Sequence, residues 1–254
     1  MSPRHQFILQ QLQSTGEVAV KALAFQFEVT EMTIRRDLDE MERLGKCIRT
    51  HGGAMLSTQA VVEFAFSKNA VEHTEAKQAI AQCMAKLVPA GSSLVIDTGS
   101  TTLQVARAIA HHKNLRVLTS SLAIASTLFA HEGIELILLG GTVRKSSPDL
   151  TGPITEDALG RFTVDLAILG ADAITQEGFY TTDIGVSRIS QAMLATARKT
   201  YVVADSSKFT RQSFIRFAEW TDIHGVITDD IVPTDCLRWL KKTQVELHTA
   251  SIGS

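Results

Sequence analysis

The sequence predicts an α/β protein in two parts, a small helical unit with a β-ribbon and then a larger, mostly parallel sheet covered by helices. Two observations lead to this fold class. The first 56 residues contain three short helix-like segments and a ribbon with a glycine turn. From residue 72 onward, helix-like segments alternate with short apolar runs, as in parallel sheets whose two faces are covered. The expected domains are therefore residues 1–56 and 72–254, with a linker over 57–71.

The N-terminal part has the element order of a winged helix-turn-helix. A first helix is expected over residues 3–14 and a second over about 18–27. Thr30 can cap a third helix, which runs to about Arg43 and is stopped by Gly45. This helix repeats three apolar residues at helical spacing, namely Ile34, Leu38 and Met41. Residues 46–54 are expected to form the β-ribbon, which is the wing.

The second part is predicted to form a Rossmann-like parallel sheet. Each apolar run is short enough for a strand, and helix-like sequence lies between the runs. The expected strands cover residues 94–97, 115–119, 135–139, 166–169, 201–204 and 225–228. Because the carboxyl ends of parallel strands share one edge of the sheet, the turns that follow them are expected to meet there.

Composition excludes several classes of protein. The formal net charge is −2 and the pI is about 6.4, so any binding of nucleic acid has to be local. The three cysteines are widely spaced and form no C-x-x-C pair, which argues against a disulfide framework or a zinc site. No run is long and apolar enough for a signal peptide or a membrane span. We therefore expect a cytoplasmic protein with no metal, no cofactor and no membrane partner.

Side chains suited to DNA gather at the front of the third helix and in the wing. The rear half of this helix is acidic, with carboxylates at Asp37, Asp39, Glu40 and Glu42. Phosphates would repel it, so the helix is expected to enter a major groove with its front half. The candidate DNA-binding residues are Glu31, Met32, Thr33, Arg35 and Arg36 on the helix and Lys46, Arg49 and His51 in the wing. For the two helix arginines alone, a solvated charge run is the competing interpretation.

Residues suited to a small anion follow the first expected strand of the second part. The segment 98–102, Thr-Gly-Ser-Thr-Thr, leads into a helix, so backbone N–H groups, the helix dipole and hydroxyls can surround one phosphate. Ordinary N-capping is the competing interpretation. Hydroxyl-rich or glycine-rich turns also end later strands, at 119–121, 140–142 and 170–172. Lys208 can supply a cation at the same edge.

The segments 30–38 (Thr-Glu-Met-Thr-Ile-Arg-Arg-Asp-Leu) and 45–54 (Gly-Lys-Cys-Ile-Arg-Thr-His-Gly-Gly-Ala) resemble the signature of the DeoR family of bacterial regulators in order and spacing. The resemblance continues from about Arg4 to the last expected strand. It implies a second domain that folds like ribose-phosphate isomerases and binds a sugar-phosphate inducer. The residues that it implies for this effector site are Asp97, Gly99, Ser100, Thr101, Thr102, Ser120, Gly140 and Lys208.

One segment departs from the commoner pattern of that family. Many members carry a Glu and a Lys on the helix before the Asp-x-Ser-Lys segment, where this chain has Val186 and Ser190. The chain has Tyr-Thr-Thr-Asp at 180–183, similar to the family's ascorbate-regulon repressor, so Asp183 joins the candidate effector site. This departure favours a sugar acid over a neutral hexose phosphate. Lys77 occupies the family's usual lysine position, although a surface helix lysine is an equally good interpretation.

The sequence thus predicts a DNA-binding transcriptional repressor of a carbohydrate or sugar-acid catabolic operon, released from operator DNA by a phosphorylated sugar or sugar acid. Two alternatives remain. The second domain could be a sugar-phosphate isomerase-like enzyme that uses Asp97, Asp183 and Lys208, although no common hydrolase, metalloprotease or nucleotide-binding motif is present. It could also be only an oligomerisation platform. A single winged helix makes too little contact for specificity, so a homodimer or homotetramer is expected.

Overall fold

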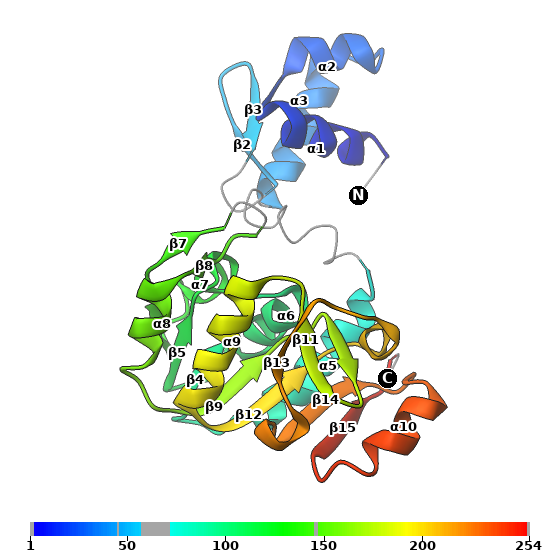
Figure 1. Cartoon of the computed structure of the whole chain (residues 1–254). Coiled ribbons are helices and arrows are strands. Elements are labelled where there is room, and N and C mark those ends of the chain that lie inside the picture. Colours follow the sequence, from blue (N-terminus) through cyan, green and yellow to red (C-terminus); the bar gives the residue numbers. More distant parts are fainter. Residues whose placement is uncertain (1–2, 45, 57–71, 145–146, 253–254) are drawn as a thin grey trace. The chain divides into compact units, whose positions relative to one another are not determined.

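The computed structural model describes residues 3–44, 46–56, 72–144 and 147–252. The chain divides into two compact units, residues 1–67 and 68–254, which Figure 1 draws with their elements labelled. Each unit has its own hydrophobic core. Helices and strands occur in both units, so the predicted α/β class is confirmed. The expected linker at 57–71 and the expected helix stop at Gly45 lie outside the described residues.

The N-terminal unit contains the elements of a winged helix-turn-helix. These are α1 (Pro3–Thr15), β1 (Glu17–Ala19), α2 (Val20–Gln26), α3 (Glu31–Arg43), β2 (Cys47–Arg49) and β3 (Gly53–Leu56). The strands form an antiparallel sheet in the order β1–β3–β2, in which β2 and β3 are the wing. Apolar side chains from all three helices and from the strands form one core.

Helix α3 forms as the sequence predicts. The Thr30 side chain accepts a hydrogen bond from the Thr33 backbone N–H and so caps the helix. Ile34, Leu38 and Met41 are all fully buried in the core of the unit. The predicted narrow buried face is therefore confirmed, and the exposed Met32, Arg35 and Arg36 lie off it.

Residues 18 and 19 belong to strand β1 and not to the second helix, which corrects the sequence prediction. Val18 pairs with Ala54 and Ala19 with Gly53, and α2 begins at Val20. Gly53 permits this pairing, because a Cβ atom there would lie 1.9 Å from the Val18 carbonyl oxygen. The apolar spacing suits a helix, but pairing with a strand distant in sequence decides the structure.

The second unit is built on a parallel sheet. Its strands are β4 (Ser93–Ile96), β5 (Leu115–Thr119), β6 (Ile134–Leu138), β9 (Val164–Leu169), β12 (Ala197–Val203), β14 (Gly225–Asp229) and β15 (Glu246–Ala250). They lie in the order β15–β14–β12–β9–β4–β5–β6. All the expected strands are present, although β12 begins at Ala197 and β15 is not among the expected strands.

The order of the strands reverses between β4 and β9. From β4 the chain adds β5 and β6 on one side, whereas β9, β12, β14 and β15 lie on the other. Right-handed crossovers place α6 (Ser100–Ile109) on one face of the sheet and α9 (Ile184–Thr196) on the opposite face (Figure 1). Helix α5 (Thr74–Leu87) packs against α6. Ligands of open α/β sheets bind at such a reversal, beyond the carboxyl ends of the strands.

Short elements leave from this edge of the sheet. A hairpin of β7 (Thr142–Val143) and β8 (Leu150–Thr151) follows β6. An antiparallel sheet of β10 (Ala173–Thr175), β11 (Gly178–Thr181) and β13 (Ile215–Ala218) begins after β9. Alternating helices and apolar runs do not predict these strands, because each is too short for a recognisable period. The other elements are α7 (Leu122–Leu128), α8 (Pro153–Leu159), η1 (Ser206–Thr210), η2 (Trp220–Asp222) and α10 (Thr234–Leu240).

Membrane-spanning helices and metal sites are both absent from the described residues. Within them, no helix combines the length and the apolar character that crossing a membrane requires. In the same part of the chain, no three His, Cys, Asp or Glu side chains are grouped so that they can hold a metal ion. The cysteines at 47, 83 and 236 are all free thiols.

Candidate functional sites

The front of α3 presents exposed side chains of mixed character. Met32 is 72% exposed, and Arg35 and Arg36 are exposed as well. Glu31 and Arg35 form an ion pair at 3.4 Å, and the Thr33 hydroxyl shares a hydrogen bond with the cap residue. A helix that enters a major groove needs such side chains on the side away from its core. The geometry of α3 is therefore compatible with the predicted contact with DNA.

The acidic rear half of α3 is less repulsive to DNA than the sequence suggests, because three of its carboxylates, Asp37, Asp39 and Glu42, have partners within the unit. Buried Asp37 accepts hydrogen bonds from Nε and Nη2 of Arg4, at 2.5 and 3.0 Å, and lies 3.2 Å from Nε2 of His5. Burial opposes its ionisation, but these hydrogen bonds outweigh burial and hold the pKa of Asp37 below its ordinary value. Asp37 thereby fastens α1 to α3.

Arg49 connects the wing to the same rear half of α3. Its guanidinium lies 3.1 Å from Asp39 Oδ1 and donates to the Gly53 carbonyl at 3.4 Å. The Arg49 backbone N–H donates to Glu42 Oε1 at 2.7 Å. These contacts indicate that Arg49 positions the wing, a role that the sequence does not reveal.

The wing itself exposes polar and apolar side chains. His51 lies at the turn between β2 and β3 and is exposed, and Lys46 is half-buried just before β2. Ile48 and Met55, which pair across the two strands, are 45% and 46% exposed. The turn of the wing is therefore accessible to a partner outside the unit.

The start of α6 carries backbone N–H groups that no side chain caps. Gly99 is the N-cap residue, with φ 147°, and no side-chain cap hydrogen bond is present there. Thr102 does not cap the helix either, since its hydroxyl donates to the Gly99 carbonyl at 3.0 Å. Thr101 is buried and Ser100 half-buried, and the buried Thr98 hydroxyl has no hydrogen-bond partner among the described residues. These features favour an anion-binding turn over ordinary N-capping.

Asp97, at the end of β4, is a buried carboxyl group. It is 3% exposed, its Oδ1 accepts from the Thr98 backbone N–H at 2.8 Å, and the Ser190 hydroxyl lies 3.5 Å from its Oδ2. Burial raises the pKa of Asp97 to about 7, although hydrogen bonds from the backbones of Thr98 and Gly170 lower it. Near neutral pH this group therefore exists in both protonated and ionised forms.

Lys77 is buried at the start of α5, which rules out the alternative of a surface lysine. It is 4% exposed, and its Nζ donates to the Glu72 carbonyl at 2.6 Å. Burial lowers the pKa of Lys77, Lys208 acts in the same direction, and Asp205 raises it. Asp205 and Lys208 therefore both lie within electrostatic reach of Lys77. Asp205, which follows β12, is 1% exposed, and within the described residues its Oδ2 has no hydrogen-bond partner.

The guanidinium of Arg144 lies between two carboxylates near the same edge. Arg144 follows β7 and donates through Nε and Nη2 to the two oxygens of Asp149, each at 2.6 Å. Its Nη1 lies 3.4 Å from Asp183 Oδ2. Burial lowers the pKa of Arg144, but the two carboxylates outweigh burial and raise it overall. The charge of Asp149 raises the pKa of Asp97 and the charge of Arg144 lowers it, so both groups lie near Asp97.

The other predicted effector residues help to hold this edge together. Ser120 is buried, and its carbonyl accepts from the Leu150 N–H at 2.9 Å. The Gly140 carbonyl accepts from the Thr155 hydroxyl at 2.7 Å. Asp183 caps α9 through its Oδ1. The structure thus brings all the predicted effector residues to the carboxyl edge of the sheet, but Ser120 and Gly140 act there through their backbones.

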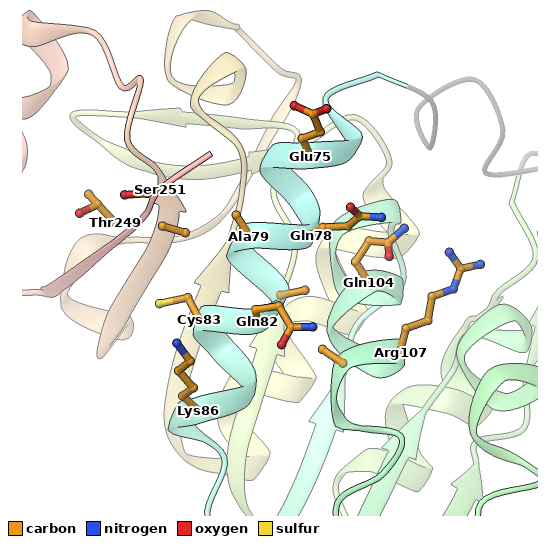
Figure 2. A pocket seen from close by; sticks show the side chains of 13 residues that line it. Glu75, Gln78, Ala79, Gln82, Cys83, Lys86, Gln104, Arg107, Thr249 and Ser251 are labelled. Atoms are coloured by element: carbon orange, nitrogen blue, oxygen red, sulfur yellow. The ribbon is translucent and has the colours of Figure 1, made fainter. Parts of the chain in front are cut away.

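Two surface hollows lie apart from these residues. A groove of about 860 Å³ runs along α5 and α6 beside the end of β15, and Figure 2 shows Gln78 and Gln82 of α5 beside Gln104 and Arg107 of α6. A second hollow of about 520 Å³ lies at the small antiparallel sheet, next to Tyr180. Neither lining contains a predicted effector residue, and the charged residues in both linings are exposed. The edge of the sheet, with its buried charges, remains the candidate ligand site.

Sequence reasoning misses two residues of this edge, Arg144 and Asp149. A weak signal for Arg144 exists, because it closely follows a glycine turn at the end of an apolar run. A lone arginine in a loop is usually a solvated charge, so the signal is not specific. Asp149 is recognisable only once the β7–β8 hairpin places it opposite Arg144.

Two family models match the chain. One, described as the DeoR C terminal sensor domain, matches residues 72–230. The other, described as a DeoR-like helix-turn-helix domain, matches residues 4–60. The helix-turn-helix match lies in the first compact unit and the sensor match in the second.

Several relatives are similar over almost their whole length. A putative aga operon transcriptional repressor of Escherichia coli O157:H7 is 33% identical over 97% of this chain and 93% of its own length. The glycerol-3-phosphate regulon repressor of E. coli strain K12 is 33% identical over 96% of this chain and 97% of its own length. The transcriptional repressor AccR of Agrobacterium fabrum is 32% identical over 87% of each chain.

Among solved structures, ribose 5-phosphate isomerase A from Neisseria gonorrhoeae is similar over 54% of this chain and 53% of its own. The two are 17% identical, with a TM-score of 0.40. A similarity at this level says nothing about activity.

Proposed function

We infer the function of this chain from the premise that it belongs to the DeoR family of transcriptional regulators, whose members among its relatives are named repressors. We propose that it represses a carbohydrate or sugar-acid catabolic operon by binding operator DNA in the cytoplasm. A phosphorylated sugar or sugar acid then releases it from the operator. The C-terminal domain binds this ligand without converting it to a product.

The front of α3 and the wing form the DNA contact. Arg35 and Arg36 are exposed on α3, and His51 is exposed at the turn of the wing. Because the chain carries a net charge of −2, affinity has to come from such local contacts. Arginines at the front of α3 can read guanine edges or pair with phosphates, and Arg49 holds the wing in place.

The burial of Lys77 close to Lys208 carries the ligand proposal. Lys77 is buried and Lys208 is half-buried, and burial and the charge of Lys208 lower the pKa of Lys77 although Asp205 raises it, so an anion bound there would stabilise both ammonium groups. Helices α5 and α6 pack together, and both begin at the carboxyl edge of the sheet, so the uncapped start of α6 faces the same region. A phosphate there accepts hydrogen bonds from backbone N–H groups of α6 and is attracted by the positive charges of the lysines.

Ligand binding lowers operator affinity through linkage. A ligand that prefers the arrangement of the chain that does not bind DNA shifts the population toward it by its differential affinity. The ligand does not need to touch the DNA. Operator recognition requires more contact than one winged helix supplies, so the working form is a homodimer or homotetramer.

The DNA half of this proposal is tested with Arg36→Ala in the full chain and DNA selected by the wild-type protein from a random pool. We expect about 10- to 100-fold weaker binding, because one good arginine contact is worth about 1–3 kcal/mol. Arg43→Ala is the matched control, since it removes the same charge from the same face of α3 two turns further on. Equal effects of the two substitutions would contradict docking by the front of the helix.

The ligand half is tested by measuring which sugar phosphates release the selected DNA. Lys208→Ala is expected to keep its DNA affinity but to lose release by the active compound. Lys199→Ala is the matched control, because Lys199 is exposed at the opposite end of β12. A Lys208→Ala protein that responds normally would remove Lys208 from the site, and turnover of the compound would show an enzyme.

A further inference from the structure

Arg144 is firmly held on one side and weakly held on the other. Its Nε and Nη2 donate to Asp149, whose side chain is 1% exposed, and this bidentate pair fixes the plane of the guanidinium. Its Nη1 meets Asp183 at 3.4 Å, which is longer than the roughly 2.7–2.9 Å of a charge-assisted hydrogen bond. The Arg144 side chain is 18% exposed and that of Asp183 is 40% exposed. Nη1 is therefore the nitrogen that an anionic group of a ligand can bind in place of Asp183.

Asp183 uses a different oxygen for each of its contacts. Oδ1 accepts the Val186 N–H at 3.0 Å and caps α9, whereas Oδ2 faces Arg144. The cap does not depend on the contact with Arg144, because the two involve separate atoms. An incoming anion can therefore replace Oδ2 at Nη1 while α9 keeps its cap.

Arg144 and the lysines lie on opposite sides of the start of α6. The hairpin that carries Arg144 follows β6 and is bridged to Ser121, at the end of β5. Lys208 follows β12, on the other side of β4. Neighbouring strands are roughly 4.8 Å apart, so one or two strand spacings separate the α6 turn from the hairpin. A carbon chain of three to six atoms covers about that distance.

We propose that Arg144 recognises a carboxylate at the end of the ligand opposite its phosphate, and that the ligand is therefore a phosphorylated sugar acid. This inference rests on the proposed function, since it requires a phosphorylated ligand at the same edge. The carboxylate binds Nη1 in place of Asp183, while Asp149 keeps the guanidinium in position. Such preorganisation reduces the entropy lost on binding.

The acidic side chains around Arg144 do not prevent this binding. Asp149 is neutralised by its bidentate pair. Asp172 accepts hydrogen bonds from the Thr181 hydroxyl and from the N–H and hydroxyl of Thr182, at 3.0, 2.9 and 3.2 Å. Asp97 can accept a proton near neutral pH, because burial raises its pKa to about 7. Because the pair of Arg144 and Asp149 carries no net charge, the ligand carboxylate gains a charge-assisted hydrogen bond from Nη1 and not a net positive field.

The experiment compares pairs of ligands that differ only in the group at the far end. The pairs are 3-phosphoglycerate with glycerol 3-phosphate, 4-phosphoerythronate with erythritol 4-phosphate, and 6-phosphogluconate with glucitol 6-phosphate. Binding to the full chain is measured by calorimetry. We expect the acid of at least one pair to bind about tenfold more tightly than its alcohol, as a charge-assisted contact requires.

Two substitutions assign this preference to Arg144. Arg144→Gln should reduce the preference to within about twofold by weakening only the acid, since the alcohol makes no charged contact there. Asp183→Asn should strengthen binding of the acid about threefold or more, because asparagine still caps a helix but no longer competes for Nη1. The second variant keeps the test decisive if the first does not fold.

The outcomes separate this inference from the proposed function. If neither member of any pair binds, the phosphorylated ligand itself is wrong. If the alcohol binds at least as tightly as the acid in every pair that binds, or if Asp183→Asn weakens binding of the acid, the role of Arg144 is wrong while the sugar-phosphate site stands.

Discussion

At the scale of the residue, burial sets the chemistry of Asp97. The carboxyl group ends strand β4 at the point where the strand order reverses, and it is 3% exposed. Hydrogen bonds from two backbone N–H groups stabilise its ionised form, but desolvation outweighs them. A side chain that is ionised in water at neutral pH thus holds a proton for part of the time. This gives the folded state a pH dependence that a single substitution can remove.

Asp97→Asn is expected to stabilise the protein above neutral pH. The folded-state pKa of about 7 lies above the ordinary value of this carboxyl group. The contribution of Asp97 to the free energy of unfolding is therefore fully present below about pH 4 and is lost as pH rises through 7. At pH 8 the gain from the substitution should be about 2–4 kcal/mol, since each pKa unit is worth about 1.4 kcal/mol. Asparagine keeps an oxygen that can accept the Thr98 N–H. Urea unfolding at pH 5 and pH 8 measures the effect, and a gain that is equal at both pH values would contradict it.

At the scale of the element, charged side chains connect α3 to its neighbours in the N-terminal unit. Asp37 joins α3 to α1 through Arg4, and Asp39 and Glu42 join α3 to the wing through Arg49. The sequence interpretation treats these carboxylates as charges that only repel DNA. The contacts show that they also hold the parts that would touch DNA at fixed positions relative to one another.

The two roles of the α3 carboxylates predict opposite effects on DNA binding. Asp39→Asn should weaken binding several-fold, because it releases Arg49 and loosens the wing. If Asp39 only repelled phosphates, the same change would strengthen binding. Glu40→Gln is the matched control, since Glu40 is the exposed neighbour of Asp39 and the charge change is identical. Fluorescence anisotropy with the selected DNA measures both, and tighter binding by Asp39→Asn would refute the positioning role.

At the scale of the whole molecule, a DNA-binding unit and a ligand-binding unit are carried on one chain. Each has its own core, so each can change without unfolding the other. Regulation then requires only that the ligand prefers one arrangement of the chain. If the ligand lowers operator affinity by some factor, operator DNA must lower the affinity for the ligand by the same factor.

The full chain is expected to bind DNA as a homodimer or homotetramer. Sedimentation of the free protein and of its complex with selected DNA should give a multiple of the chain mass of 27.6 kDa. The selected sequences should contain repeated half-sites spaced by about one helical turn or a multiple of it. A complex of one chain with a single unrepeated site would show that oligomerisation is not needed.

The sequence by itself determined helices α1 and α3, the main strands and the end of the sheet that carries the candidate site. Apolar residues at helical spacing marked the buried face of α3, and a hydroxyl at Thr30 marked its start. Apolar runs marked β4 and β5, and the small residues after them marked the carboxyl edge. These features are local, because each depends on spacing within one segment and on the preferences of single residues.

Only the tertiary structure decided which distant residues meet. Val18 became part of a strand because Gly53 lets the backbones approach. Lys77 is buried close to Lys208, and Arg144 is held between Asp149 and Asp183. A lone charge in a sequence has the same pattern whether it is solvated or paired. Its partner is supplied by another segment, and the energy that distinguishes the two states comes from burial and from that partner.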